Sequence, residues 1–192
     1  MSRDLGRALE ERLYCLWDGK PSMAMLRYRD SRLPELTKDR YRSFLSSAVP
    51  GLVLASRVEE EANPELADAG YDSASSWLLE QTRDPNKFGL LLAENMNFGF
   101  RRNLLALKPI ALGIDVVAVV LIIGMVVASW TGEIESTVSA LSLEWSAGAV
   151  VVVGHALVFL GYIRVDWVRR AADTYARRLL GSCDALEKSM LP

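Results

Sequence analysis

Hydrophobic and polar positions along this chain follow two patterns, one amphipathic and one continuously apolar. The continuously apolar stretches occupy residues 110–130 and 145–163. The first contains a single charged residue, Asp115, and the second contains no charged residue and one histidine, His155. Each stretch is close to the roughly 20 residues that a helix needs to cross a bilayer core about 30 Å thick. The pattern predicts a two-span transmembrane hairpin connected by the loop 131–144.

Charges beside the two stretches predict their orientation. The basic residues near the spans all lie on the side of the chain termini: Arg101, Arg102, Lys108, Arg164, Arg169 and Arg170. The loop 131–144 has no basic residue and carries Glu133, Glu135 and Glu144. Cytoplasmic flanks of spans carry an excess of Lys and Arg, so both termini are predicted to be cytoplasmic. Aromatic residues indicate the same edges, with Trp130 and Trp145 outside and Phe98, Phe100, Tyr162 and Trp167 inside.

The segment before the hairpin is amphipathic at helical spacing. Residues 2–17 carry leucines in one stripe, which predicts a first helix. A second helix is expected to have Pro34 in its first turn and to end at Pro50. A third is expected to start at Asn63, a capping residue followed by a first-turn proline. Residues 51–57 fit either a short strand or a segment packed on the second helix.

Two further segments flank the hairpin. Residues 97–109 mix aromatic residues with arginine beside an apolar span, which is typical of an interfacial helix. The interfacial helix is expected to break before Pro109, so that the chain bends where it enters the first span. Residues 164–192 are expected to continue the helix of the second span without stopping. Their apolar residues recur every three or four positions, which suits a coiled-coil seam or packing on the amino-terminal domain.

The sequence therefore predicts an all-α integral membrane protein, with a two-span transmembrane hairpin, a cytoplasmic N-terminal helical domain and a cytoplasmic C-terminal helix. In chain order the predicted segments are a cytoplasmic mainly helical domain (1–96), an interfacial juxtamembrane segment (97–109), transmembrane helix 1 (110–130), an external acidic loop (131–144), transmembrane helix 2 (145–163) and a cytoplasmic amphipathic or coiled-coil helix (164–192).

The composition of the chain makes several classes of function less favourable. Lys and Arg total 22 against 24 Asp and Glu, a net charge of −2 that suggests no nucleic-acid partner. One histidine and two distant cysteines do not supply a compact zinc site. The sequence contains no glycine-rich phosphate loop or nucleophile elbow. We therefore expect no metal, no cofactor and no enzymatic activity, with an unmotifed carboxylate or tyrosine site in the cytoplasmic domain as the alternative. The opening residues lack the apolar region of a signal peptide, so no cleavage is expected.

Candidate functional residues within the spans fall into two groups. Asp115 and His155 are polar at membrane depth, where such residues are costly and often functional. Their depths differ by only about 3 Å at a rise of about 1.5 Å per residue, so they can hydrogen-bond across the hairpin. Either the pair only stabilises the packing of the helices, or it has a role in gating or proton movement. Ala147, Gly154 and Gly161 recur every seven residues and form a seam where another helix can approach, within one chain or between copies.

Charges in the cytoplasmic domain are segregated into a basic half, residues 20–42, and an acidic half, residues 58–84. The basic half either binds an anionic ligand or lipid or simply faces the acidic half. The arginines considered for contact with an anionic lipid or ligand are Arg27, Arg29, Arg40, Arg42, Arg101 and Arg102.

The predicted function is a non-enzymatic membrane-anchored sensor or interaction protein. Its cytoplasmic domain would bind a protein partner or an anionic small molecule, and its hairpin would anchor it among membrane lipids as a homo-oligomer. One alternative is a self-assembling pore-forming or membrane-disrupting effector, and another is a membrane-bound enzyme. The layout is similar to that of small two-span membrane effectors of bacterial nucleotide-signalled defence. That similarity of plan implies a bacterial inner (plasma) membrane.

Overall fold

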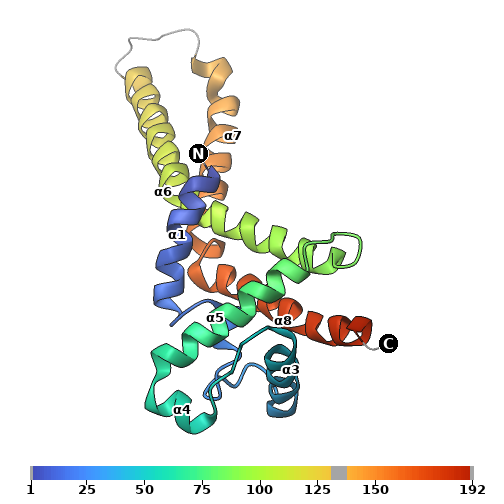
Figure 1. Ribbon diagram of the computed structural model, residues 1–192. Coiled ribbons are helices and arrows are strands. Elements are labelled where there is room, and N and C mark those ends of the chain that lie inside the picture. The colour runs from blue at the N-terminus through green and yellow to red at the C-terminus, as the bar shows by residue number, and fades with distance from the viewer. Residues whose placement is uncertain (1, 131–137, 191–192) are drawn as a thin grey trace.

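The computed structural model describes the backbone of residues 2–130 and 138–190, and the side chains of 2–128 and 146–190. Every element in these ranges is helical, which confirms the all-α fold class. The elements are α1 (Ser2–Leu16), α2 (Pro21–Ala24), α3 (Glu35–Ala48), α4 (Arg57–Ala62), α5 (Pro64–Gln81), α6 (Gly89–Trp130), α7 (Val138–Leu157), the π-helical turn η1 (Val158–Tyr162) and α8 (Val165–Met190). Figure 1 shows a helical body from which the second half of α6 projects together with α7.

The body is built around the carboxy-terminal helix. Leu179 and Leu180 of α8 lie in one hydrophobic core with Leu45 of α3 and with Tyr71 and Leu78 of α5. Leu180 and Leu45 are fully buried. The apolar face of α8 therefore packs on the amino-terminal helices, and this packing is the second of the two alternatives for residues 164–192. A coiled coil between copies along the same face would require the body to open.

A second hydrophobic core lies where the hairpin meets the body. It brings together Leu13 and Trp17 near the end of α1, Phe98 of α6, Ile163 after η1 and Trp167 of α8. Each of these side chains is less than a tenth exposed. Because α6 leads into the hairpin and α8 follows it, this core fixes both ends of the hairpin to the body.

Helix starts follow the capping residues. The Asn63 side chain accepts a hydrogen bond from the Leu66 amide at the start of α5, as predicted. Pro34 is the N-cap of α3 and not a first-turn residue. Residues 52–56 of the segment 51–57 are neither strand nor helix, and α4 begins at Arg57. Ser56 starts α4 with a reciprocal capping box, in which its side chain accepts from the Glu59 amide and the Glu59 side chain accepts from the Ser56 amide.

The structure corrects the predicted break before the first span. α6 runs without interruption through Pro109, from Gly89 to Trp130, so residues 97–109 are not a separate element. Figure 1 shows the ribbon changing direction between its amino-terminal half and its apolar half. Proline removes one backbone hydrogen bond and its ring crowds the preceding turn, so it can bend a helix without ending it.

The predicted continuity beyond the second apolar stretch is wrong. The helix ends at Tyr162, the next residue, Ile163, is extended with a ψ of 92°, and α8 begins at Val165 with the axis turned by 57°. The Lys108 ammonium donates a hydrogen bond of 2.8 Å to the Ile163 carbonyl oxygen. That carbonyl lies at a helix end, where it lacks an intrahelical partner. The bend at Pro109 and the break after Ile163 thus lie at the same level of the hairpin.

One strongly apolar helix among the described residues can span a membrane. It is α6, over Gly89–Ala128, and only 6% of its most apolar window is buried within the chain. A helix that is apolar all round and unburied is not the core helix of a globular domain. The described part of the second stretch, Ser146–Tyr162, satisfies the same criteria only jointly with α8 across the bend. The predicted external loop 131–144 is too long, because α7 already begins at Val138. Residues 131–137 of that loop and the side chains of Trp130 and Trp145 lie outside the described parts.

Candidate functional site

The structure brings Asp115 and His155 together between α6 and α7. Nδ1 of His155 lies 2.8 Å and 2.9 Å from the two carboxylate oxygens of Asp115. Asp115 is buried, with 8% of its surface exposed. The His155 ring also lies 4.6 Å from the Phe159 ring, between centroids. The pair therefore links the two helices of the hairpin in its half nearer the body.

The His155 side chain is only partly covered by this contact. It remains 41% exposed, against 11% for the Asp115 side chain. Nδ1 is engaged, and Nε2 makes no hydrogen bond to any residue that the structure describes. A polar nitrogen without a partner is costly in an apolar environment. A further hydrogen-bonding group, from water or from another chain, would stabilise this nitrogen.

We expect the Asp115–His155 contact to be worth about 1 kcal/mol in a double-mutant cycle, the magnitude found for hydrogen bonds between membrane helices. The cycle combines Asp115→Asn with His155→Gln, and unfolding is followed in detergent. The control cycle pairs His155→Gln with Asp173→Asn, because Asp173 lies on α8 in the body and forms its ion pair with Arg32, between α2 and α3. A coupling no larger than in the control cycle would contradict the contact.

The predicted glycine seam does not close the hairpin within one chain. A Cβ atom built on Gly154 or on Gly161 would meet no atom within 4 Å among the described residues. Val150 and Leu157, close to Gly154 on α7, are 72% and 65% exposed. This face of α7 is therefore open, and the side that meets α6 is different.

The basic and acidic halves of the amino-terminal region face each other. Arg27, only 4% exposed, forms ion pairs of 2.6 Å with Asp68 and 2.7 Å with Asp18. Lys20 pairs with Asp72 at 2.7 Å. Two ion pairs, Arg27 with Asp68 and Lys20 with Asp72, thus join the basic half to the acidic half.

Arg42 is buried inside this interface. Its guanidinium donates to the Leu26 carbonyl at 2.7 Å and to the Tyr71 hydroxyl at 2.8 Å, and it lies 4.0 Å from the Tyr28 ring centroid. The Tyr71 hydroxyl in turn donates to Glu60 at 2.6 Å. Burial raises the pKa of Tyr71 to about 12, so this hydroxyl stays protonated and can donate.

The four other predicted arginines also have partners within the chain. Arg29 pairs with Asp18, Arg40 with Asp184, and Arg102 with Glu10, while Arg101 donates to the Trp167 carbonyl and the Asn97 side chain. Each of the six arginines thus has a partner within the chain. Contact with an anionic lipid or ligand stays a prediction for all of them: Arg27, Arg29, Arg40, Arg42, Arg101 and Arg102.

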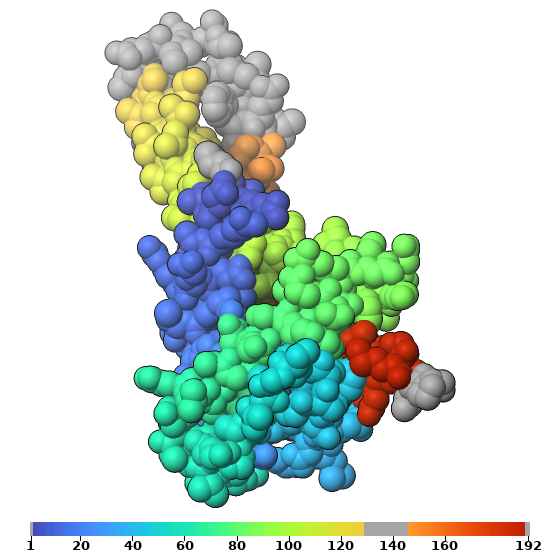
Figure 2. All heavy atoms as spheres, viewed as in Figure 1, coloured from blue at the N-terminus to red at the C-terminus, as the bar shows by residue number. Residues whose placement is uncertain are grey.

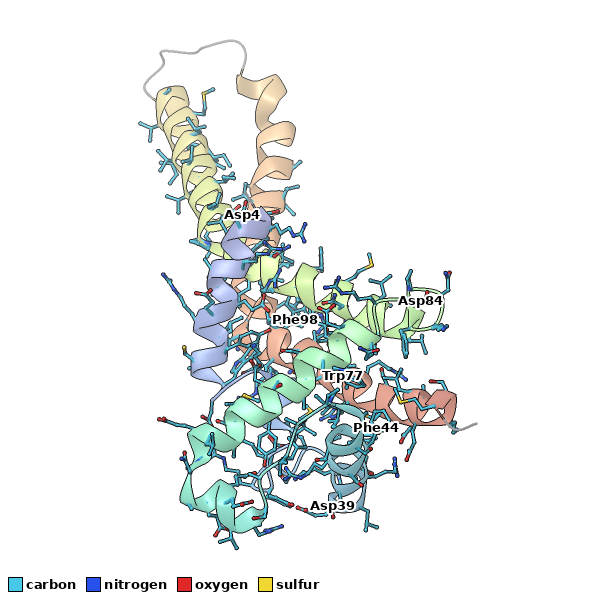
Figure 3. All side chains as sticks on the ribbon, in the orientation of Figure 1. Asp4, Asp39, Phe44, Trp77, Asp84 and Phe98 are labelled. Atoms are coloured by element: carbon cyan, nitrogen blue, oxygen red, sulfur yellow. The ribbon has the colours of Figure 1, made fainter. Side chains whose placement is uncertain are left out.

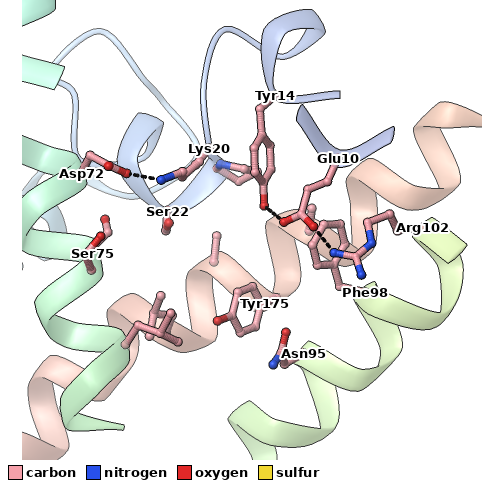
Figure 4. A pocket seen from close by; sticks show the side chains of 16 residues that line it. Glu10, Tyr14, Lys20, Ser22, Asp72, Ser75, Asn95, Phe98, Arg102 and Tyr175 are labelled. Atoms are coloured by element: carbon pink, nitrogen blue, oxygen red, sulfur yellow. Dashed lines mark hydrogen bonds and ion pairs between the residues drawn. The ribbon is translucent and has the colours of Figure 1, made fainter. Parts of the chain in front are cut away.

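A pocket lined by polar and apolar side chains, which the sequence did not indicate, lies between α1, α2, α5, α6 and α8. Its volume is about 310 Å³. Figure 4 shows two ion pairs on its rim, Lys20 with Asp72 and Glu10 with Arg102. The lining includes Glu10, Tyr14, Lys20, Ser22, Asp72, Ser75, Asn95, Phe98, Arg102 and Tyr175. Its residues come from five separate segments, so no local motif could have revealed it.

The pocket can hold a small polar molecule, but its charges are already matched. The buried Ser75 Oγ has no hydrogen-bond partner among the described residues, so no base there activates it. Burial raises the pKa of Tyr14 to about 12, and its hydroxyl donates to Glu10. No group of three or more potential metal-ligating side chains occurs within the described residues.

Comparison with known proteins gives no family model, no curated protein and no solved structure that matches this chain. The fold itself defines the class. It is an all-helical protein in which one strongly apolar helix, continuous with a helical body, can span a membrane.

Proposed function

We propose that this protein is a non-enzymatic membrane-anchored interaction protein whose hairpin crosses the bilayer twice. The observation that carries the proposal is the contrast between the two parts of one chain. Only 6% of the most apolar window of α6 is buried within the chain. The other half of the same helix contributes buried side chains to the two hydrophobic cores of the body. Lipid is the environment that satisfies a helix with an exposed apolar surface on every side.

The charges support a cytoplasmic body and cytoplasmic termini. The basic residues beside the hairpin are all at the end where it joins the body, including Lys108, Arg164 and Arg169. The predicted outer loop carries only acidic charge. The positive-inside tendency then assigns the body to the cytoplasmic face.

Two features of α7 support self-association of the hairpin. The glycine seam of Ala147, Gly154 and Gly161 is open at both glycines, which lets another helix backbone come close. His155 is partly exposed and its Nε2 is available to a neighbouring chain. The apolar face of α8 lies in the body core, which favours α7 over α8 for this role.

We predict that the double substitution Gly154→Leu and Gly161→Leu weakens self-association, because each leucine occupies the space into which the second backbone would pack. Oligomers are measured by cross-linking in native membranes and by fluorescence energy transfer between labelled copies in vesicles. Gly113→Leu is the matched control, since Gly113 is equally open but lies on α6. Equal oligomer yields in the double variant and the control would remove this face of α7 from the interface.

A second candidate function is a pore-forming or membrane-disrupting effector, favoured by the polar Asp115–His155 pair at membrane depth. Two helices cannot enclose a pore, so this function requires several copies. An anchor leaves the membrane potential of expressing cells unchanged. A depolarisation that the Gly154→Leu and Gly161→Leu variant abolishes would instead identify the effector.

A further inference from the structure

The half of α6 that belongs to the body is apolar on two opposite faces. Leu91 and Phe98 lie in the body cores and are 5% and 4% exposed. Leu92, Met96 and Phe100, spaced four residues apart on another face, are 44%, 67% and 62% exposed. Residues 96 and 98 are separated by about 200° around a helix that turns 100° per residue. The exposed stripe therefore points away from the body.

The exposed stripe faces the same side as the hairpin. Phe98 stacks on Tyr175 of α8, with ring centroids 6.4 Å apart, so the buried face of α6 is the one turned to α8. Figure 1 shows α8 and α5 on the side of this half of α6 away from the hairpin tip. On the hairpin side, Figure 2 shows the first turns of α1 (blue) beside the foot of the hairpin and no described helix over the rest of this half of α6. If the hairpin spans a bilayer, the stripe lies against the membrane surface.

The first turns of α1 carry a net positive charge near the foot of the hairpin. Arg3 and Arg7 are exposed there, and Asp4 between them is exposed as well. Figure 3 places Asp4 beside the foot of the hairpin and Phe98 within the body. The same helix is fixed to α6 by the ion pair between Glu10 and Arg102. The two arginines are thus held near the level at which the first span enters the apolar region.

We infer that Leu92, Met96 and Phe100 rest in the headgroup region of the bilayer, with Arg3 and Arg7 contacting the phosphates of anionic lipids. This inference rests on the proposed function, because only a hairpin that crosses the bilayer brings lipid to this face. An apolar stripe flanked by basic residues is the arrangement with which helices bind the membrane interface. The contact residues differ from the predicted interfacial set, since Phe98 is buried and Arg101 and Arg102 bind within the chain.

The test places an environment-sensitive fluorophore, NBD, on single cysteines in the full chain. The background lacks Cys15 and Cys183, and the protein is reconstituted in nanodiscs of phosphatidylcholine with or without phosphatidylglycerol. Met96→Cys reports the proposed contact, Val120→Cys reports the hairpin, and Leu66→Cys on α5 is the control. All three native side chains are similarly exposed, at 67%, 62% and 70%. Quenching is measured with nitroxide-labelled lipids, carrying the nitroxide on the headgroup or deep in the acyl chain.

We expect headgroup nitroxide to quench the label at position 96 about twofold or more above the control, as for a helix face in the interface. Phosphatidylglycerol should increase this quenching, and Arg3→Gln with Arg7→Gln should remove the increase. Quenching at position 96 equal to the control, or a blue-shifted label that lipid does not quench, would overturn the inference. If deep nitroxide quenches position 120 in the same samples, the hairpin proposal survives that failure. If position 120 is not quenched, the proposed function itself fails.

Discussion

Replacing Leu180 with alanine is expected to lower the free energy of unfolding by about 2–5 kcal/mol, the range for truncating a fully buried leucine. Leu180 is 0% exposed in the core that α8 shares with α3 and α5. Met190→Ala on the same helix is the control. Met190 is 53% exposed, so its change should stay within about 0.5 kcal/mol. Thermal and denaturant unfolding in detergent micelles measure both.

The same substitution separates the two roles that the sequence allowed for the carboxy-terminal helix. If Leu180 packs inside one chain, its loss destabilises the body at every protein concentration and leaves the oligomer distribution unchanged. If it lined a coiled coil between copies, the destabilisation would depend on protein concentration and cross-linked species would decrease. A concentration-dependent effect, or equal effects of the two alanine variants, would contradict the packing of α8 described above.

The fold was predictable where the determining interactions are local. Asn63 followed by a proline specified the start of α5, and the apolar run before Trp130 specified a helix of membrane length. The end of the second helix at Ile163 was not predictable, because the Lys108 ammonium that binds its carbonyl is distant in sequence. The start of α4 is also specified locally, because Ser56 followed three residues later by Glu59 is the sequence pattern of a capping box.

The candidate site shows the same division. Counting residues from the basic flanks gave Asp115 and His155 similar depths, and the structure brings them into contact. The sequence could not show whether Arg27 and Arg42 bind a ligand or other residues of the chain, because an arginine is suited equally to both kinds of contact. The partners that decide it, such as Asp68, come from another helix. The pocket could not be predicted from the sequence either, because its lining residues come from segments that are distant in sequence.

The orientation of the hairpin predicts an all-or-none difference in thiol accessibility. Cys15 is exposed on α1, on the body side. Burial raises the pKa of Cys183 to about 12, and a protonated, buried thiol does not react with maleimides. In a Cys15→Ser background, a cysteine introduced at Ser139 in the predicted outer loop is therefore the one reactive thiol, and it reports on the outer side of the membrane. In the unmodified chain Cys15 is the one reactive thiol, and it reports on the side of the body.

The central claim, that the hairpin crosses the bilayer with the body inside, is tested most directly by labelling right-side-out spheroplasts with an impermeant maleimide. We predict that Ser139→Cys reacts before permeabilisation and that Cys15 reacts only after it. A double variant lacking Cys15 and Cys183 sets the background, and a permeant maleimide confirms that each thiol is reactive. Labelling of Cys15 but not of position 139 in sealed spheroplasts would reverse the topology. Equal accessibility of both positions would show that the hairpin does not cross the membrane.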